Sequence, residues 1–419
     1  MSAKFTRRKF MATTAAGAAA ATFKFPMPAV AQATPFKLGL LTVKTGPLAQ
    51  GGIQMEQGVL TWLKEHNNKM AGRPVEFFSA DTGGKPAGTK TKAQELIERD
   101  RVDVIVGPLA AFELLAISDY IREQKTPTLS LAGADDLTQR KPNPYFMRPS
   151  ATSSQCMQPM GHYAAKEMGL KKAITIDYDF AFGYEQEGGF QAAFEKDGGC
   201  VTAKLWAPLG TPDYTPYLAQ MSGNDVLCQG FAGSGPLAFM KQLRNYGLKF
   251  PVVTGETGGD DALLHAFGDE AVGMVSCVPY TLDLQTDANQ KFVKAVFKEF
   301  NTVPGQYAAG LYVNCDVVEG GLKGAGGSVE DKEKFMAALK AVNLPDTPRG
   351  PIKFDHLGNV VGDFYVRHLE KRSDAPYGLK LWNKTVKTYK DVGQFWTWPE
   401  KEFLAHPVYS RDYPPLSKC

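Results

Sequence analysis

The side chains that could do chemistry in this sequence do not combine into an arrangement that enzymes commonly use. The six histidines are scattered, and none belongs to an H-E-x-x-H zinc motif. Residues 231–235 (F-A-G-S-G) lack the first glycine of a nucleophile elbow, so a plain loop is favoured there. Asp177 and Asp179 could act as a pair of acids, but an aspartate that caps a loop after a strand is the simpler interpretation. The sequence therefore gives no support for an enzyme.

Motifs for cofactors and metals are equally weak. The chain contains no G-x-x-x-x-G-K-[ST] motif, no G-x-G-x-x-G motif after a strand and no C-x-x-C pair. Cys228 and Cys277 lie in predicted strands, where a cysteine usually acts as a small buried apolar residue. A disulfide between Cys200 and Cys228, on neighbouring strands, stays open as an alternative. We expect no cofactor and no metal.

The segments that could hold a ligand are the loops that follow predicted strands. In open α/β sheets, ligands bind at the carboxyl ends of the strands and between domains. These loops are rich in Gly, Ala and Phe and poor in charge, which suits a compact and largely apolar solute. Several lead directly into helices, whose free backbone N–H groups can hold a carboxylate without an arginine. The loops are 42–50, 107–113, 132–138, 179–185, 230–236 and 255–260.

Alternating strand and helix patterns must position these loops. A buried strand is predicted at 36–43, and a helix at 53–67 carries Met55, Val59 and Trp62 on one stripe. The rest of the first series predicts strands at 75–79, 102–106 and 128–131 and helices at 90–99 and 114–124. This order predicts a parallel sheet with right-handed crossovers and helices on both faces.

A second series begins near residue 150. It predicts strands at 173–177, 201–206, 226–230, 251–253 and 273–279 and helices at 154–168, 186–196, 236–246 and 260–267. Three consecutive helices follow at 287–301, 306–322 and 329–342, and then a strand pair near 352–355 and 360–368. The fold class is therefore α/β with two sheets. The tail 392–419 is rich in aromatic residues and proline, and we expect it to wrap a domain in extended form.

The N-terminus has the three-part layout of an export signal. Residues 1–33 contain five basic residues and no acid, with Arg7 and Arg8 before an Ala-rich run and small residues at Ala31 and Ala33 that offer cleavage sites. The paired arginines favour the twin-arginine route and thus a bacterial periplasm. Removing these five bases from the 47 Lys and Arg leaves 42 against 44 Asp and Glu. That balance gives no reason to expect a nucleic-acid partner.

Several stretches, in order along nearly the whole chain after residue 33, resemble the periplasmic solute-binding proteins of ATP-driven importers, of the type that binds branched-chain amino acids. They lie at 37–42, 45–49, 96–100, 102–108, 143–150, 182–185 and 350–359. The resemblance implies two Rossmann-like lobes, joined by three crossing strands, that close on a solute and deliver it to a membrane permease. It implies a monomer in the periplasm, and no membrane span is expected after residue 33. The implied division is 34–149 with 283–362 for lobe 1, 150–282 with 363–391 for lobe 2, and 392–419 as the tail.

The resemblance also assigns site residues, and the sequence departs from the family at several of them. The loop after Gly107-Pro108 usually has a small hydroxyl residue where this chain has Ala110 and Ala111, and the next loop has a Thr or Ser where this chain has alanine. The acid that usually holds an α-ammonium corresponds to Glu256, or one place later to Thr257. The ligand-binding residues implied in this way are Thr45, Leu109, Ala110, Ala111, Ala132, Gly133, Ala134, Arg148, Phe182, Phe231, Glu256, Thr257 and Tyr280.

Simpler roles stay open for four of these residues. Phe182 and Phe231 could be ordinary core, Arg148 could pair with an acid at a lobe crossing, and Glu256 could be an acid favoured at a helix start. The missing hydroxyls and the added rings lead to the hypothesis that the ligand is an aromatic or otherwise hydrophobic carboxylate. The alternatives are a branched-chain or aromatic amino acid and, more distantly, a role as the ligand-sensing partner of a membrane receptor.

Overall fold

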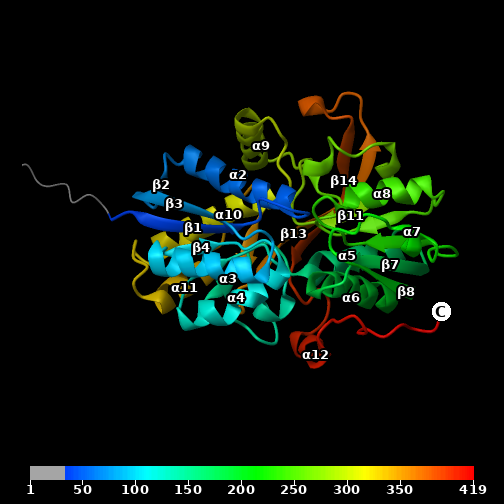
Figure 1. The fold of residues 1–419 in the computed structure, drawn as a ribbon, viewed down its shortest axis with the longest axis horizontal. Helices are drawn as coiled ribbons and strands as arrows, with labels where there is room; N and C mark the ends of the chain where they lie inside the picture. Colours follow the sequence, from blue (N-terminus) through cyan, green and yellow to red (C-terminus); the bar gives the residue numbers. More distant parts are fainter. Residues whose placement is uncertain (1–33) are drawn as a thin grey trace, which may run out of the picture. The chain divides into compact units, whose positions relative to one another are not determined.

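Runs of β-branched and aromatic residues form the strands of two separate sheets in the computed structural model, which describes residues 34–419 (Figure 1). The first sheet is mainly parallel. Its buried strand β1 pairs with β3 on one side and β4 on the other. In spatial order it contains β2 (Lys69–Met70), β3 (Arg73–Asp81), β1 (Phe36–Thr42), β4 (Val104–Val106), β5 (Thr128–Leu129) and β6 (Phe146–Met147).

The second sheet has a parallel centre and an antiparallel side. Strands β7 to β11 run parallel to one another, and β13 pairs antiparallel with β11, β12 and β14. In spatial order it contains β12 (Ile352–Phe354), β13 (Val360–Lys371), β11 (Val275–Val278), β10 (Val252–Thr254), β9 (Val226–Gln229), β7 (Lys172–Tyr178) and β8 (Cys200–Ala207), with β14 (Leu381–Val392) beside β13. The α/β class with two sheets, predicted from the sequence, is confirmed.

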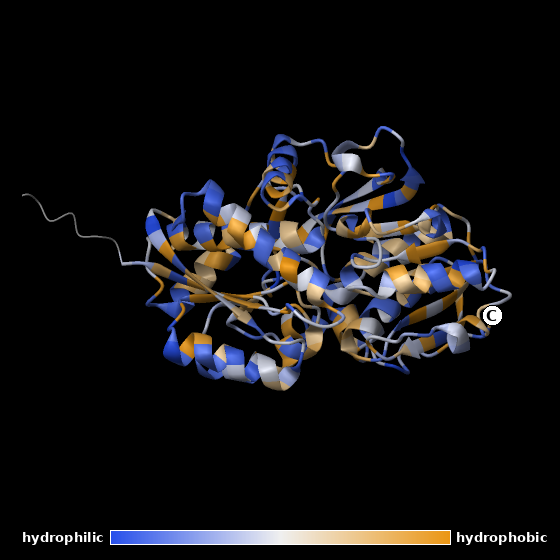
Figure 2. Ribbon diagram, turned by 45° about the horizontal axis from the view of Figure 1, so that its top comes forward, coloured by the Kyte–Doolittle hydropathy of each residue, from blue (hydrophilic) through white to orange (hydrophobic). Residues whose placement is uncertain are grey.

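Amphipathic helices cover these sheets. In α2 (Ala49–Glu65) the predicted stripe of Met55, Val59 and Trp62 is completely buried. Figure 2 shows the matching pattern, with strands largely apolar and helices polar on one side. The remaining helices are α3 (Pro86–Gln94), α4 (Ala111–Glu123), α5 (Ser153–Lys166), α6 (Ala181–Lys196), α7 (Thr215–Leu218), α8 (Gly235–Asn245), α9 (Asp287–Phe300), α10 (Gln306–Gly324), α11 (Lys332–Lys340) and α12 (Glu400–Ala405).

The chain passes between the sheets after β6, after β11 and around the start of β13. At the last of these, the N–H of Arg148 donates to Gly358 O (2.9 Å) and the N–H of Val360 donates to Arg148 O (3.0 Å), so β13 begins beside β6. From Val360 onward it pairs with β12, although the sequence-based division assigns residues up to 362 to the first lobe. The exact lobe boundaries stay a prediction.

The tail differs from its prediction in one respect. It contains a short helix, α12, which follows Pro399 and has Glu400 and Glu402 in its first turn. Acidic residues at a helix N-terminus stabilise the helix dipole, and the buried ring of Phe403 anchors the helix to the rest of the chain. The other tail residues run without regular structure to the C-terminus beside β8 (Figure 1).

The disulfide joins Cys200 to Cys419, so the alternative pairing with Cys228 is wrong. Cys200 lies on β8 and Cys228 on β9, and β7 separates these two strands in the sheet. Cys228 and Cys277 are buried and free, as expected for small apolar core residues.

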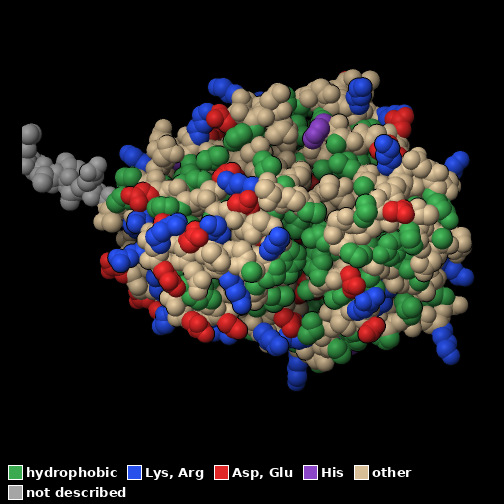
Figure 3. Space-filling view, viewed as in Figure 1, with side chains coloured by type: hydrophobic (Ala, Val, Ile, Leu, Met, Phe, Trp, Pro, Cys, Tyr) green, Lys and Arg blue, Asp and Glu red, His purple; other side chains and the backbone are tan. Residues whose placement is uncertain are grey.

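The export signal, with Arg7, Arg8, Ala31 and Ala33, lies outside the described residues. Within residues 34–419, no helix has the length and apolar composition needed to cross a bilayer. On the face drawn in Figure 3, acidic and basic side chains are interspersed without an extended region of one sign.

Candidate functional site

A cavity lies where loops from the carboxyl ends of both sheets meet. The space between its walls, open solvent included, is about 380 Å³. Its walls come from the loops after β1, β4, β5, β7, β9 and β10 and from the start of α10. The lining residues are Leu48, Leu109, Ala110, Ala111, Leu131, Gly133, Phe180, Phe182, Ala232, Glu256, Thr257, Gln306 and Tyr307.

The walls are apolar and aromatic. Phe180 and Phe182 stack at 6.1 Å between ring centroids, and Phe180 meets Phe112 of α4 edge to face at 5.3 Å. Phe112 lies after β4 of the first sheet and Phe180 after β7 of the second sheet, so this contact joins the two sides of the cavity. Such a lining favours a flat ring, because aromatic rings pack offset or edge-on against one another.

Three helices begin at the cavity. Ala111 is the first residue of α4, Phe182 the second of α6, and Gln306 and Tyr307 start α10. N–H groups in the first turn of a helix have no carbonyl partner within that helix and carry its positive dipole end. The N–H of Gln306 already donates to Asp260 Oδ1, so the starts of α4 and α6 are where the cavity can hold an anion on backbone N–H groups, although no Lys or Arg lines it.

Glu256 supplies the carboxylate in these walls. Its side chain is only 4% exposed, and within residues 34–419 its Oε2 has no hydrogen-bond partner. Burial raises the pKa of Glu256 to about 8, although the charges of Arg349 and Arg148 act in the opposite direction. A buried oxygen without a partner costs free energy, so this atom is available for a polar group of a ligand.

Arg148 does not reach the cavity and instead holds one of its loops. It is completely buried, and its Nε and Nη2 donate to the carbonyls of Ala132 (2.9 Å), Gly133 (2.7 Å) and Ala134 (2.8 Å). Its Nη1 donates to Thr138 and, at 3.0 Å, to Asn359 Oδ1. These contacts use all five guanidinium donors.

The interpretation of Arg148 as a ligand residue therefore needs correction, because no donor is left for a ligand carboxylate. The simpler interpretation fits better, because the charges of the buried acids Asp135 and Glu185 act on this guanidinium, although its hydrogen-bond partners are neutral. The family-based assignment of Arg148 as a ligand residue fails because sequence does not show that three carbonyls turn toward this guanidinium.

The loop that Arg148 holds is also fixed from the second side of the cavity. Glu185 of α6 accepts hydrogen bonds from the N–H groups of Ala134 (3.1 Å) and Asp135 (2.9 Å). Burial raises the pKa of Glu185 well above its usual value, and the neighbouring charge of Asp135 adds to this shift. Gly133 lines the cavity between these anchors, so the loop is held from both sides.

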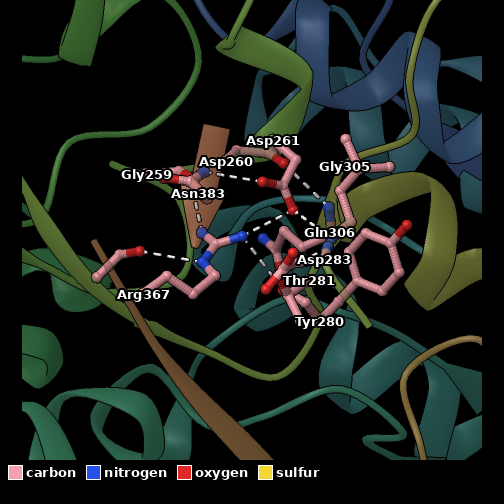
Figure 4. A network of polar contacts seen from close by, with 12 residues as sticks. Gly259, Asp260, Asp261, Tyr280, Thr281, Asp283, Gly305, Gln306, Arg367 and Asn383 are labelled. Carbon is pink, nitrogen blue, oxygen red and sulfur yellow. Dashed lines mark hydrogen bonds and ion pairs between the residues drawn. The ribbon is translucent and has the colours of Figure 1, made fainter. Parts of the chain in front are cut away.

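A buried polar network positions the loop that follows Glu256 (Figure 4). Arg367 Nη1 lies 2.7 Å from Asp261 Oδ2, and Asn383 Nδ2 donates to Asp261 Oδ1 at 2.8 Å. The preceding residue, Asp260, accepts from the N–H of Gln306 at 3.0 Å. This last bond joins the β10 loop to the start of α10, so it sets the distance between two walls of the cavity.

Seven of the thirteen predicted ligand residues line the cavity: Leu109, Ala110, Ala111, Gly133, Phe182, Glu256 and Thr257. Thr45 is exposed outside it, and Ala132 and Ala134 are buried behind Gly133. Phe231 packs within about 5 Å of Tyr214 and Phe239, as core. Tyr280 packs edge-on against Phe292 at 6.2 Å, away from the lining.

The sequence interpretation missed six lining residues: Leu48, Leu131, Phe180, Ala232, Gln306 and Tyr307. Leu48, Phe180 and Ala232 lie in the predicted loops, and Leu131 is the last residue of the predicted strand 128–131. Gln306 and Tyr307 begin the predicted helix 306–322, directly after Pro304-Gly305. The predicted start of that helix could have identified these two residues, because helix N-termini commonly face anionic ligands.

The family model described as periplasmic binding protein matches residues 35–374. The chain belongs to this family. It thereby shares the type I periplasmic binding protein fold, with two α/β sheets, and the resemblance inferred from the sequence is confirmed. The family is one of solute-binding proteins and not of enzymes.

Curated and solved relatives agree with this assignment. The Leu/Ile/Val-binding protein homolog 6 of Brucella melitensis is 29% identical over 85% of this chain and 92% of its own length. A solute-binding protein of an ABC transporter from Rhodopseudomonas palustris BisB5, solved with 3,4-dihydroxybenzoic acid, is 32% identical over 86% of this chain and 98% of that one, with a TM-score of 0.80. Another from R. palustris, solved with 4-hydroxybenzoate, is 28% identical over 86% and 99%, also with a TM-score of 0.80. This chain is accordingly a substrate-binding protein of an ABC transporter.

Proposed function

We propose that this periplasmic binding protein captures a small aromatic carboxylate in the cavity between its two lobes. The observation that carries the proposal is the lining itself, with two phenylalanine rings and alanines in the position of hydroxyl residues. An aromatic ring packs against Phe180 and Phe182, and the carboxylate faces first-turn N–H groups such as that of Ala111. The complexes of the R. palustris relatives with hydroxylated benzoic acids support this ligand class.

Glu256 fits an aromatic carboxylate when it is protonated. With a pKa of about 8, the carboxyl is mostly neutral at pH 7, and it can donate one hydrogen bond to an oxygen of the ligand. A neutral acid in an apolar wall avoids the repulsion that an ionised one would exert on the ligand.

The second candidate is a branched-chain or aromatic amino acid, and Glu256 is also the observation that favours it. An ionised Glu256 would pair with the α-ammonium, which cannot be buried without such a partner at an acceptable cost. The similarity to the Leu/Ile/Val-binding protein homologues of Brucella supports this second candidate.

Calorimetric titration separates the two candidates. Benzoate, 4-hydroxybenzoate and cinnamate are each titrated into the purified protein, beside leucine and phenylalanine. We expect saturable binding of the aromatic acids and at least a hundredfold weaker binding of both amino acids. Tight leucine binding with no heat from the acids would overturn the proposal.

The cellular part of the proposal follows from the family and the N-terminal sequence. We infer that the chain is exported to the periplasm, works there as a monomer, and presents its closed, ligand-loaded form to a membrane permease. Closure would occur between the predicted lobes, 34–149 with 283–362 and 150–282 with 363–391. A reporter protein fused behind residues 1–33, with Arg7 and Arg8 replaced by lysine as the control, tests the export route.

A further inference from the structure

The C-terminal tail builds a second cavity, separate from the one between the lobes. Its empty volume is about 630 Å³. It lies between the tail, helix α6 and the loop after β5, near α12 in Figure 1. The lining residues are Arg140, Ala192, Lys196, Trp398, Phe403, His406, Pro407, Tyr409, Tyr413 and Pro414. Seven of these ten come from the tail, which lies outside the residues 35–374 that the family model matches.

Four aromatic rings form a continuous wall of this cavity. Trp398 and Phe403 lie 6.2 Å apart between ring centroids, Phe403 and Tyr409 6.1 Å, and Tyr409 and Tyr413 6.4 Å with nearly parallel planes. Part of the wall is firmly held, because the ring of Tyr409 packs directly over Gly188 of α6, where a Cβ would approach it to 2.3 Å. A wall of this kind offers faces and edges for one more ring.

Two cations stand at the wall, and the lining contains no Asp or Glu. Lys196 Nζ lies 4.6 Å above the ring of Trp398 and donates to Thr397 Oγ1 at 3.1 Å. The guanidinium of Arg140 lies 5.5 Å above the ring of Phe403, donates to the carbonyls of Phe403 and His406, and pairs with Asp136 at 3.1 Å. Within residues 34–419 the Lys196 ammonium contacts the Trp398 ring and Thr397 Oγ1 and forms no ion pair with an acid, so its charge is available to an anion.

From this combination we propose that the tail cavity is a second binding site for a small aromatic carboxylate. The ring of the ligand packs against Trp398, Phe403 and Tyr413, and its carboxylate pairs with the Lys196 ammonium. Binding therefore requires both the ring and the carboxylate of the ligand. Acetate, which lacks the ring, and benzyl alcohol, which lacks the charge, should not bind. The proposal goes beyond the proposed function, since it does not depend on what the cavity between the lobes binds.

The test reads the tail site without the first site. In the variant Ala111→Phe, the new ring fills the cavity between the lobes. Titrating this variant with 4-hydroxybenzoate should leave one saturable site per chain, which neither acetate nor benzyl alcohol occupies. Adding Lys196→Met, which keeps the apolar stem and removes the charge, should weaken that site at least tenfold. Lys294→Met, at an exposed lysine of α9, is the matched control and should leave the affinity unchanged.

A second measurement locates the site in the unmodified protein. Crystals grown with 4-bromobenzoate should show an anomalous bromine peak beside Trp398 and Tyr413. The proposal is overturned if Ala111→Phe binds no aromatic acid, if Lys196→Met leaves the remaining affinity unchanged, or if the bromine peak appears without saturable binding in solution. Failure of the proposed function would look different, because the unmodified protein would then bind aromatic acids only at the site that Lys196→Met weakens.

Discussion

Raising the pH through the range in which Glu256 ionises is expected to weaken binding of aromatic carboxylates and strengthen binding of amino acids. Burial raises the pKa of this carboxyl to about 8. At that pKa, roughly nine-tenths of the groups are protonated at pH 7 and roughly one-tenth at pH 9. A ligand that needs the neutral acid therefore loses about a factor of ten in affinity between these pH values, while one that needs the carboxylate gains.

Electrostatics set the limit of this effect. Two like charges about 5 Å apart repel by about 3 kcal/mol at an effective dielectric constant near 20, which corresponds to roughly a hundredfold change in affinity. The neighbouring charges of Arg349, Arg148, Asp260 and Asp135 act on the same group, the two arginines favouring ionisation and the two acids opposing it. The tenfold loss expected by pH 9 is thus well inside what this site can produce.

The assay is calorimetric titration of 4-hydroxybenzoate and of leucine at pH 7, 8 and 9, with wild type and the variant Glu256→Gln. The glutamine keeps the shape and a hydrogen-bond donor but does not titrate. It should therefore bind the aromatic acid with little change in affinity and a flat pH profile. The reasoning is refuted if wild type and the variant show the same pH profile, because Glu256 would then not act on the ligand.

Three further substitutions test the site and the tail. Phe182→Ala should weaken binding of 4-hydroxybenzoate by about 1–2 kcal/mol through the lost ring contact, measured by calorimetry, and an unchanged affinity would remove Phe182 from the site. Arg148→Met should lower the free energy of unfolding by several kcal/mol, because it leaves the buried carbonyls of the 132–134 loop without donors, and denaturant titration would show this. Cys419→Ser opens a loop with a sequence separation of 219 residues. On the chain-entropy model this costs up to about 5 kcal/mol, and guanidinium unfolding curves should show the loss while 4-hydroxybenzoate still binds between the lobes.

The local sequence pattern was sufficient to predict the helices and strands and many of the residues that line the cavity. The period of Met55, Val59 and Trp62 predicts the buried face of α2 because a helix repeats about every 3.6 residues. The loops were placed from the ends of the predicted strands, and Ala111, Phe182 and Glu256 within these loops do line the cavity. Such positions follow from chain order, because parallel strands bring their carboxyl ends to one edge of a sheet.

The direction in which a side chain points, and its contacts with residues far away in the chain, could not be predicted from the sequence. Phe231 belongs to a correctly identified loop, but its ring turns into the core against Tyr214 and Phe239 rather than into the cavity. Arg148 looked free to bind a ligand because its carbonyl partners are backbone atoms, which leave no trace in residue type. The partner of Cys200 lies at the far end of the chain, and only the path of the tail brings it close.

That path has a consequence for how the protein behaves at high concentration. β8 is an outer strand of the second sheet, and an uncovered outer strand presents unpaired N–H and C=O groups on which another chain can add a strand. The tail runs along this side of the molecule, where Lys204 of β8 donates to Pro414 O at 2.5 Å and the disulfide fixes Cys419 to the start of the strand. Cutting the chain before residue 410 should therefore favour self-association through β8, measured as light scattering that rises with concentration more steeply than for the full chain.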